Sequence, residues 1–444
     1  MKENLIIKRD EYVDLLMQKR WNGKVKIITG IRRCGKSYLL NTLFKQRLLE
    51  EGVSEDCLVE IALDKTSDSK FRNPHTLYDY VISLTGDPGK KYYVMIDEIQ
   101  LSYKVKNTDI DESLVPEEDR EMLYTTFYDV LNDLMSRPNL DVYVTGSNSK
   151  MLSKDIVTNF RDRGSEIKLA PLSFREYYPF SGLERAEALE QYLTFGGMPL
   201  AVLEQAESDK VKYLEGLFSN VYFKDITERY KLKDDTVLSA LVDVLSSSVG
   251  SLANPHKLAN TAATLLDKTA SDHTIKNYLD YLEDAYLFRS AKRYDVKGRR
   301  YFGTIRKYYA VDLGLRNARL NFRQQERSHL MENLLYNDLV CRGYSVDVGV
   351  VEVEQIQDGK RTQSQYEIDF VVNIGNDKVY IQSALNVDTP EKKAQETFSL
   401  HHTGDFFKKI VVLDGSRKRW VDEDGVIYIG VIPFLLEEDH VFDR

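Results

Sequence analysis

The sequence has little cysteine and no long apolar run. Its 444 residues include three cysteines, Cys34, Cys57 and Cys341, whose number and wide spacing do not suit a disulfide framework or a metal site. No apolar stretch approaches the roughly 18 residues of a membrane span, and the N-terminal residues show no signal-peptide core. These absences predict a cytoplasmic protein with no membrane partner.

The chain also lacks a basic excess, low-complexity segments and internal repeats. Its formal net charge of -9 argues against a protein coated in nucleic acid, but it allows a local basic patch. With 42% hydrophobic and 30% charged residues, the composition is that of a globular protein. The length predicts two or three domains.

Residues 30–37 form the most informative motif. They fit the pattern G-x-x-x-x-G-K-[ST], the phosphate-binding loop of nucleoside triphosphatases. The glycines allow a backbone path in which successive N–H groups point at phosphate oxygens. Lys36 would reach the β- and γ-phosphates, and the Ser37 hydroxyl would bind Mg²⁺. We predict nucleotide binding by Gly30, Ile31, Arg32, Arg33, Cys34, Gly35, Lys36, Ser37 and Tyr38.

The sequences on either side suit this loop. Residues 25–29 are rich in β-branched side chains and predict a buried strand. Residues 37–44 predict a helix with Leu40, Leu43 and Phe44 inward. A helix in this position directs the positive end of its dipole at the phosphates. Strand, glycine-rich turn and helix in this order predict a nucleotide site.

A pair of acids completes the predicted hydrolytic site. Residues 92–96 are apolar or aromatic and predict a buried strand, which is followed directly by Asp97 and Glu98. Parallel sheets bind their ligands at the carboxyl ends of the strands. Asp97 would hold Mg²⁺, through water or through Ser37, and Glu98 would polarise the attacking water.

Two further groups are predicted beyond residue 140. Residues 140–149 predict a buried strand that ends in small polar residues, and Ser147 or Asn148 would sense the γ-phosphate. The alternative is a polar turn. Hydrolysis in this class often needs an arginine from a neighbouring subunit. Arg163 is the first candidate and Arg161 the second, with a surface ion pair to Asp162 as the alternative.

Motifs in nearly the whole chain resemble one family. They comprise residues 29–37, 96–100, 145–149, 163–164, 172–177, 195–199, 224–226, 307–314 and 367–370. The sequence resembles the bacterial and archaeal AAA+-type ATPases with an N-terminal AAA domain and a C-terminal domain of unknown function, DUF4143. This resemblance implies ATP binding and hydrolysis. The family usually has Gly-Arg where this chain has Asp162-Arg163.

The predicted fold class is α/β, with four parts. They are an AAA+-like P-loop domain with a parallel sheet (1–172), a helical lid (173–233), a winged helix (234–312) and a restriction-endonuclease-like α/β domain (313–444). The resemblance implies the lid, and it places the DUF4143 region at about 220–400. We expect a homo-oligomeric ring, with six or seven subunits.

The prediction of a winged helix is based on three predicted helices and a basic hairpin. The third helix is capped by Ser271, and the following segment, 286–310, has eight basic residues and one acidic residue. A helix–turn–helix with a basic wing is a DNA-binding arrangement. The candidate residues for double-stranded DNA are Arg289, Lys292, Arg293, Lys297, Arg299 and Arg300. The alternatives are a protein partner, a lid, or an acidic face of the next subunit.

The C-terminal part resembles a nuclease fold with an incomplete site. Active nucleases of this type use two acids and an E-x-K triplet to bind metal and position water. Glu332 and Asp369 match the acids, but Gln382 and Ala384 replace the glutamate and the lysine. We therefore expect a non-cleaving remnant.

The sequence thus predicts an ATP-driven or ATP-gated oligomer that uses ATP and Mg²⁺ and acts on DNA or a partner through its C-terminal half. One alternative is a slow nucleotide-dependent regulatory switch or scaffold with protein partners. The other is a metal-dependent nuclease.

Overall fold

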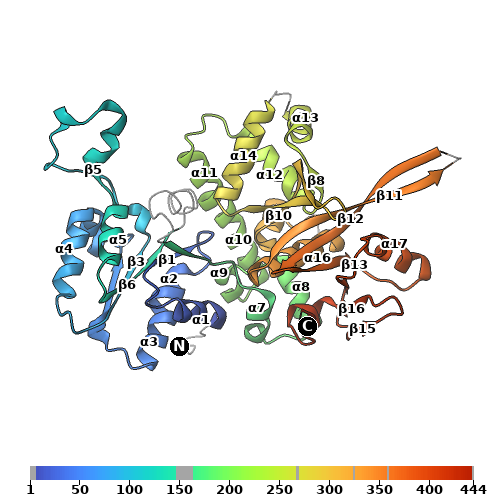
Figure 1. Ribbon diagram of the computed structural model, residues 1–444, viewed down its shortest axis with the longest axis horizontal. Coiled ribbons are helices and arrows are strands. Elements are labelled where there is room, and N and C mark those ends of the chain that lie inside the picture. The colour runs from blue at the N-terminus through green and yellow to red at the C-terminus, as the bar shows by residue number, and fades with distance from the viewer. Residues whose placement is uncertain (1–6, 147–163, 267–269, 324–325, 358–359, 443–444) are drawn as a thin grey trace. The chain divides into compact units, whose positions relative to one another are not determined.

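The computed structural model describes residues 7–146, 164–266, 270–323, 326–357 and 360–442. Its contacts divide the chain into two compact units, Met1–Ala170 and Pro171–Arg444. Each unit is built around its own sheet, and Figure 1 shows the helices and strands of both.

A five-stranded sheet forms the centre of the first unit (Figure 1). The strand order is β2-β3-β6-β1-β7, and every neighbouring pair is parallel. Most of its side chains are buried on both faces, as expected for a parallel sheet covered by helices. The strands are β1 (Val25–Thr29), β2 (Leu58–Ala62), β3 (Tyr92–Asp97), β6 (Leu140–Thr145) and β7 (Gly164–Lys168).

Helices cover both faces of this sheet because its side chains alternate between two apolar surfaces. On one face Ile27, Val94 and Val142 join a core with α4 and α5. On the other, Phe44 packs against Tyr93 and Tyr143. The helices are α1 (Asp10–Gln18), α2 (Lys36–Tyr38), η1 (Leu39–Phe44), α3 (Lys45–Glu50), η2 (Glu55–Cys57), η3 (Thr66–Arg72), α4 (Pro74–Leu84) and α5 (Phe127–Met135).

An insertion separates β3 from α5. It contains a two-stranded ribbon, β4 (Val105–Lys106) with β5 (Tyr124–Thr125), and three short 3₁₀ helices. These helices are η4 (Ile99–Leu101), η5 (Glu112–Leu114) and η6 (Glu117–Leu123). The insertion adds no strand to the parallel sheet, so the strand order of the nucleotide-binding core is unchanged.

The second unit begins with helices and continues into a large mixed sheet. The first group is α7 (Phe174–Ser181), α8 (Arg185–Phe195), α9 (Pro199–Leu203), α10 (Glu207–Leu217), η8 (Phe218–Phe223) and α11 (Lys224–Arg229). Next come α12 (Thr236–Ser247), α13 (Pro255–Leu266) and α14 (Asp272–Asp284), whose N-terminus is capped by Ser271 as predicted. The later helices are α15 (Leu313–Arg319), α16 (Arg327–Cys341), α17 (Pro390–His401) and α18 (Val431–Leu435).

The nine strands of this sheet run in the order β15-β16-β14-β13-β12-β11-β9-β10-β8. The strands are β8 (Leu252–Ala253), β9 (Phe288–Asp295), β10 (Arg300–Ala310), β11 (Ser345–Gln357), β12 (Lys360–Ile374), β13 (Asp377–Ala384), β14 (Lys408–Leu413), β15 (Trp420–Val421) and β16 (Ile427–Gly430). The hairpin β9–β10 is continuous with the C-terminal strands, because β9 pairs with β10 and with β11. Two apolar clusters lie on the sheet, one around Phe370 and the other around Tyr380.

The α/β class, with a parallel P-loop sheet and a further C-terminal sheet, is confirmed. The strands predicted at 25–29, at 92–96 and within 140–149 are present as β1, β3 and β6, and Leu40, Leu43 and Phe44 are buried. The division into four parts stays a prediction. The helices assigned to a lid belong to the second unit.

Candidate nucleotide site

The carboxyl ends of three parallel strands bring the predicted nucleotide-binding groups to one edge of the sheet. Strand β6 lies between β1 and β3, and Ile28 and Thr145 are partners in the register of β1 and β6. The N–H of Gly146 donates to the carbonyl oxygen of Ile28 over 3.1 Å. The loop after β1 and the acids at the end of β3 therefore flank the end of β6, where ligands of parallel sheets bind.

The loop itself needs glycine at its first position. Gly30 has a φ of 144°, and a Cβ built on it would lie 2.2 Å from the backbone oxygen of Leu169. Gly35 has a φ of 97° and precedes the first helical residue. Arg33, with a φ of 62°, adopts the left-handed conformation that non-glycine residues rarely use. These torsions give the loop the backbone path that phosphate binding requires.

The ammonium of Lys36 lies within the loop. The side chain is buried, and Nζ donates to the carbonyl oxygens of Gly30 at 3.1 Å and Ile31 at 3.0 Å. These two bonds keep a positive charge against the turn, where the motif would place the phosphates. A ligand anion would compete with two neutral acceptors for this ammonium, and it would add the attraction between opposite charges.

A helix starts at Lys36 and extends through α2, η1 and α3 to Glu50. Its middle section, Leu39–Phe44, has π-helical hydrogen bonding, which occurs frequently near functional sites. Ser37 and Tyr38 are exposed in the first turn, while Leu39 and Leu40 are fully buried. The helix thus presents the serine hydroxyl at its positive end and anchors itself through the following leucines.

Thr145 links the two acids at the end of β3. Its hydroxyl donates to the carboxylate of Asp97, and its oxygen accepts from the N–H of Glu98 at 2.9 Å. Asp97 is only 4% exposed. One side chain at the end of β6 therefore fixes the carboxylate of one acid and the backbone of the next.

Glu98 has a strained backbone, and a hydrogen bond fixes its side chain. Its φ is 53° and its ψ is 50°, a left-handed conformation unusual for glutamate. The carboxylate of Glu98 accepts a hydrogen bond from the amide of Gln100. Strain of this kind persists where surrounding contacts fix it, and here Thr145 and Gln100 supply such contacts.

Three supporting residues were absent from the sequence prediction. Thr145 and Gln100 act on the acids as described, and Arg9 supports the loop. The buried guanidinium of Arg9 donates to the carbonyl oxygens of Cys34 at 3.4 Å and Ala170 at 3.0 Å. Thr145 and Gln100 lie within the motifs at 145–149 and 96–100, which gave them no role, and no motif includes Arg9.

Four predicted residues lie outside the described part of the chain. Ser147 and Asn148, predicted as γ-phosphate sensors, fall within 147–163, as do the arginine candidates Arg161 and Arg163. Their roles stay predictions.

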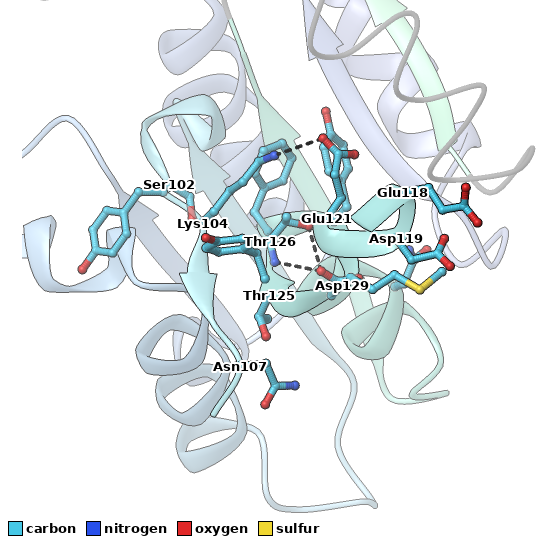
Figure 2. A pocket seen from close by; sticks show the side chains of 15 residues that line it. Ser102, Lys104, Asn107, Glu118, Asp119, Glu121, Thr125, Thr126 and Asp129 are labelled. Atoms are coloured by element: carbon cyan, nitrogen blue, oxygen red, sulfur yellow. Dashed lines mark hydrogen bonds and ion pairs between the residues drawn. The ribbon is translucent and has the colours of Figure 1, made fainter. Parts of the chain in front are cut away.

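A separate pocket of about 990 Å³ is lined by the insertion and by the start of α5 (Figure 2). Glu118, Asp119, Glu121 and Asp129 line it, and Lys104 lies 4.0 Å from Glu121. Figure 2 also shows the contact between Thr126 and Asp129, which caps α5. A lining with this acidic excess repels phosphate, so the pocket does not serve as the triphosphate site.

The candidate DNA-binding residues of the β9–β10 hairpin differ in exposure. Lys292, Lys297, Arg299 and Arg300 are exposed, and Arg289 is half-buried. Arg300 lies 3.3 Å from Asp295, and Lys297 donates to the backbone oxygen of Glu352 at 2.9 Å. Arg293 is buried and donates to Gln365, so its guanidinium is turned inward.

Comparison with known proteins identifies the first unit. Residues 22–178 match the AAA domain family. An uncharacterized protein of Haemophilus influenzae is 30% identical over 437 residues, which cover 97% of this chain and 99% of that protein. The chain belongs to that protein's family. It is an AAA-domain protein with the P-loop of nucleotide-binding proteins.

A second relative is more distant. The uncharacterized protein MJ1544 of Methanocaldococcus jannaschii is 27% identical over 410 residues, which cover 89% of this AAA-domain protein and 81% of the relative.

The expected C-terminal family was wrong. Residues 186–326 match a different family, Domain of unknown function (DUF8612), and not DUF4143. The motifs that suggested DUF4143 include three closely packed glycines. A Cβ atom would lie 2.4 Å from the carboxylate of Asp312 at Gly196, 2.1 Å from the backbone oxygen of Leu172 at Gly197, and 2.0 Å from that of Phe195 at Gly314. Close packing of this kind requires small residues in any family that uses it, so it does not distinguish one family from another.

Two solved structures align with much of the chain at low similarity. The Aeropyrum pernix ORC1 protein in complex with DNA is 11% identical, with a TM-score of 0.27 over 77% of this chain and 96% of that one. Cdc6p from Pyrobaculum aerophilum is 10% identical, with a TM-score of 0.28 over 76% and 97%. Both scores lie below 0.5, so neither establishes a shared arrangement of the whole chain. In the described residues, no helix has the length and apolar character to cross a membrane.

Proposed function

We propose that this AAA-domain protein binds and hydrolyses ATP with Mg²⁺. The observation that carries the proposal is the contact of Thr145 with both acids, at the strand end that adjoins the P-loop. A protein that only bound nucleotide would need the loop and Lys36. The fixed carboxylate of Asp97 and the strained Glu98 suit hydrolysis as well.

The side chains at this edge fit a magnesium ion. Mg²⁺ prefers oxygen ligands and is held by one or two protein groups together with phosphates and water. Ser37 offers an exposed hydroxyl at the start of the helix, and Asp97 offers a carboxylate at the end of β3. When bound, the ion would neutralise the charge that develops on the phosphates.

The chain's own groups have distinct roles in this proposal. Lys36 would turn its ammonium from the carbonyl oxygens of Gly30 and Ile31 to the phosphates. Glu98 would accept a hydrogen bond from the attacking water and orient it in line with the leaving group. Thr145 and Gln100 are positioning residues, since they hold the two acids and are not proposed to touch the nucleotide.

Two variants test the proposal. Glu98→Gln keeps the shape of the side chain and removes its negative charge, so ATP should still bind while turnover falls at least about 100-fold. Lys36→Ala should abolish tight binding itself. Fluorescent-nucleotide titration and phosphate release measure the two effects. Unchanged turnover in Glu98→Gln would remove the assignment of Glu98 as the catalytic residue.

We also propose that hydrolysis takes place in a homo-oligomeric ring, in which an arginine from a neighbouring subunit reaches the nucleotide. Arg163 is the first candidate for that arginine and Arg161 the second. The specific activity should then rise with protein concentration. A mixture of Glu98→Gln and Arg163→Ala subunits should recover activity, because each could supply the group that the other lacks. An activity independent of concentration would favour a slow monomeric switch.

DNA is the partner that we propose for the second unit. The support is the set of exposed cations on the β9–β10 hairpin, namely Lys292, Lys297, Arg299 and Arg300. Such contacts would go mainly to phosphates and bind duplex DNA with strong salt dependence and weak sequence preference.

A further inference from the structure

A buried lysine lies among three carboxylates in the second unit. Lys307 of β10 is 3% exposed, and its Nζ lies 2.8 Å from Oε1 of Glu332 and 2.5 Å from Oε1 of Glu367. The same ammonium is 3.9 Å from Oδ1 of Asp369. Glu332 comes from α16, and Glu367 and Asp369 come from β12. Three elements far apart in the sequence thus meet at one cation.

This cluster includes the two acids expected in a nuclease-like site. Glu332 and Asp369 are brought together, as the nuclease pattern predicts, and Gln382 accepts from the N–H of Asp369 at 3.4 Å. The lysine of that pattern is absent at Ala384. Lys307 approaches the acids from a different strand, so a positive charge is present at the centre of the site without a metal ion.

The carboxylates are held by further donors. The hydroxyl of Tyr309 donates to Oε1 of Glu332 at 2.8 Å, and the N–H of Ser383 donates to Oδ2 of Asp369 at 2.8 Å. The ammonium of Lys307 lies within 4 Å of all three carboxylates. It offsets the repulsion among acids that would otherwise be costly to bury.

We propose that the ammonium of Lys307 takes the place of a divalent metal ion in this cluster, so that the carboxylates hold such an ion only when the ammonium is removed. A hard cation such as Mn²⁺ or Mg²⁺ prefers the oxygen donors that Glu332, Glu367 and Asp369 supply. In the native chain these oxygens converge on Nζ, which lies 2.8 Å from Glu332, 2.5 Å from Glu367 and 3.9 Å from Asp369. The native site is consequently sealed against metal-dependent cleavage.

The test uses the full chain without nucleotide. Lys307→Ala removes the charge and opens space at its position, so the variant should melt at a lower temperature than wild type in EDTA. Mn²⁺ at 1 mM should then raise its melting temperature by about 5 °C or more and leave wild type unchanged. Electron paramagnetic resonance should count one more bound Mn²⁺ in Lys307→Ala than in wild type. The double variant with Asp369→Asn should lose both effects.

Each outcome decides the proposal. A folded Lys307→Ala that binds no additional Mn²⁺ overturns it. The proposal is also overturned if the wild-type protein binds Mn²⁺, or cuts plasmid DNA with Mn²⁺, and Asp369→Asn abolishes that binding or cleavage. If Lys307→Ala does not fold in EDTA, refolding in Mn²⁺ is the measurement. Recovery with the metal supports the proposal, and failure under both conditions overturns it.

Discussion

The hydroxyl of Thr145 donates a hydrogen bond to the carboxylate of Asp97. Because the same oxygen accepts from the N–H of Glu98, one short side chain connects β6 to both acids of the adjacent strand. A shift of β6 would therefore change the hydrogen bonds of Thr145 with both acids. This connection gives the proposed ATPase site a part that short sequence motifs do not reveal.

Replacing Thr145 should separate catalysis from binding. Thr145→Val keeps the shape of the side chain and removes both hydrogen bonds, so turnover should fall about 10- to 100-fold. Nucleotide affinity should change much less, because the loop is intact. Thr145→Ser retains the hydroxyl and serves as the control, with activity close to wild type. Equal turnover in the valine and serine variants would show that the hydroxyl has no positioning role.

Gly30→Ala should damage the fold of the first unit as well as nucleotide binding. The added methyl group would meet the backbone oxygen of Leu169 at 2.2 Å, a separation that real Cβ atoms essentially never show. We expect a loss of about 2 kcal/mol or more in the free energy of unfolding. Gly86→Ala is the matched control, since its nearest heavy atom is 3.9 Å away.

The tryptophans allow this loss to be assigned to one unit. The chain has two, Trp21 in the first unit and Trp420 in the second. In a Trp420→Phe background, urea unfolding followed by Trp21 fluorescence reports the first unit alone. A midpoint for Gly30→Ala equal to that of Gly86→Ala would contradict the predicted clash.

Asp312 should make the second unit less stable as the pH rises. Burial raises the pKa of Asp312 to about 6, and hydrogen bonds from the N–H groups of Gly197 and Leu315 offset only part of this effect. A group whose pKa is raised by folding adds stability below its unfolded pKa, and that stability is lost as the pH rises through about 6. Wild type should therefore lose about 1 kcal/mol relative to Asp312→Asn between pH 5 and pH 8.

Urea unfolding of the second unit at both pH values measures this difference, with Trp420 as the reporter in a Trp21→Phe background. Burial also raises the pKa of Asp338 to about 6. Subtracting the free energy of unfolding of Asp312→Asn from that of wild type at each pH removes the contribution of Asp338. A difference that stays constant or grows with pH would contradict the prediction.

Charge reversal on the hairpin should weaken DNA binding. The double variant Arg299→Glu with Arg300→Glu should reduce duplex affinity, and the slope of log affinity against log salt should fall by about 1 to 2. The control is Lys418→Glu with Arg419→Glu, which makes the same change in net charge at exposed residues in the loop before β15. If both double variants lose affinity equally, the effect reflects net charge and not the hairpin.

The core of the site was predictable because its signals are local. A parallel strand buried on both faces is rich in apolar side chains, so the sequence indicated strands at residues 92–96 and at 140–144, where Asp141 is the one charged residue. The P-loop needs particular residues at fixed spacing, so residues 30–37 could be recognised as a phosphate-binding motif from the sequence. Thr145 was missed as a partner of Asp97, because spacing does not show that β6 lies beside β3.

Lys307 shows a different limit of sequence analysis. Sequence analysis counted Lys307 with the basic residues of the hairpin, because a sequence shows the charge of a side chain but not the side of the strand on which it lies. The structure places Lys307 and Tyr309 on the same face of β10, and both contact Glu332. The alternation of side chains along a strand contains this information, but only once the buried face is known. Arg293 was grouped with the exposed cations for the same reason.

The β9–β10 hairpin also has a mechanical property. Strand β9 is bonded to β10 along most of its length and to β11 on its other side, so the hairpin is an integral part of a nine-stranded sheet. The register of the hairpin shifts between Tyr301 and Arg306 of β10, so a force applied at the tip, near Arg299, would reach the base of the hairpin through this irregular stretch. The base of the hairpin is therefore held within the sheet, and the irregular stretch of β10 is the place where a partner that pulled on the tip would bend it.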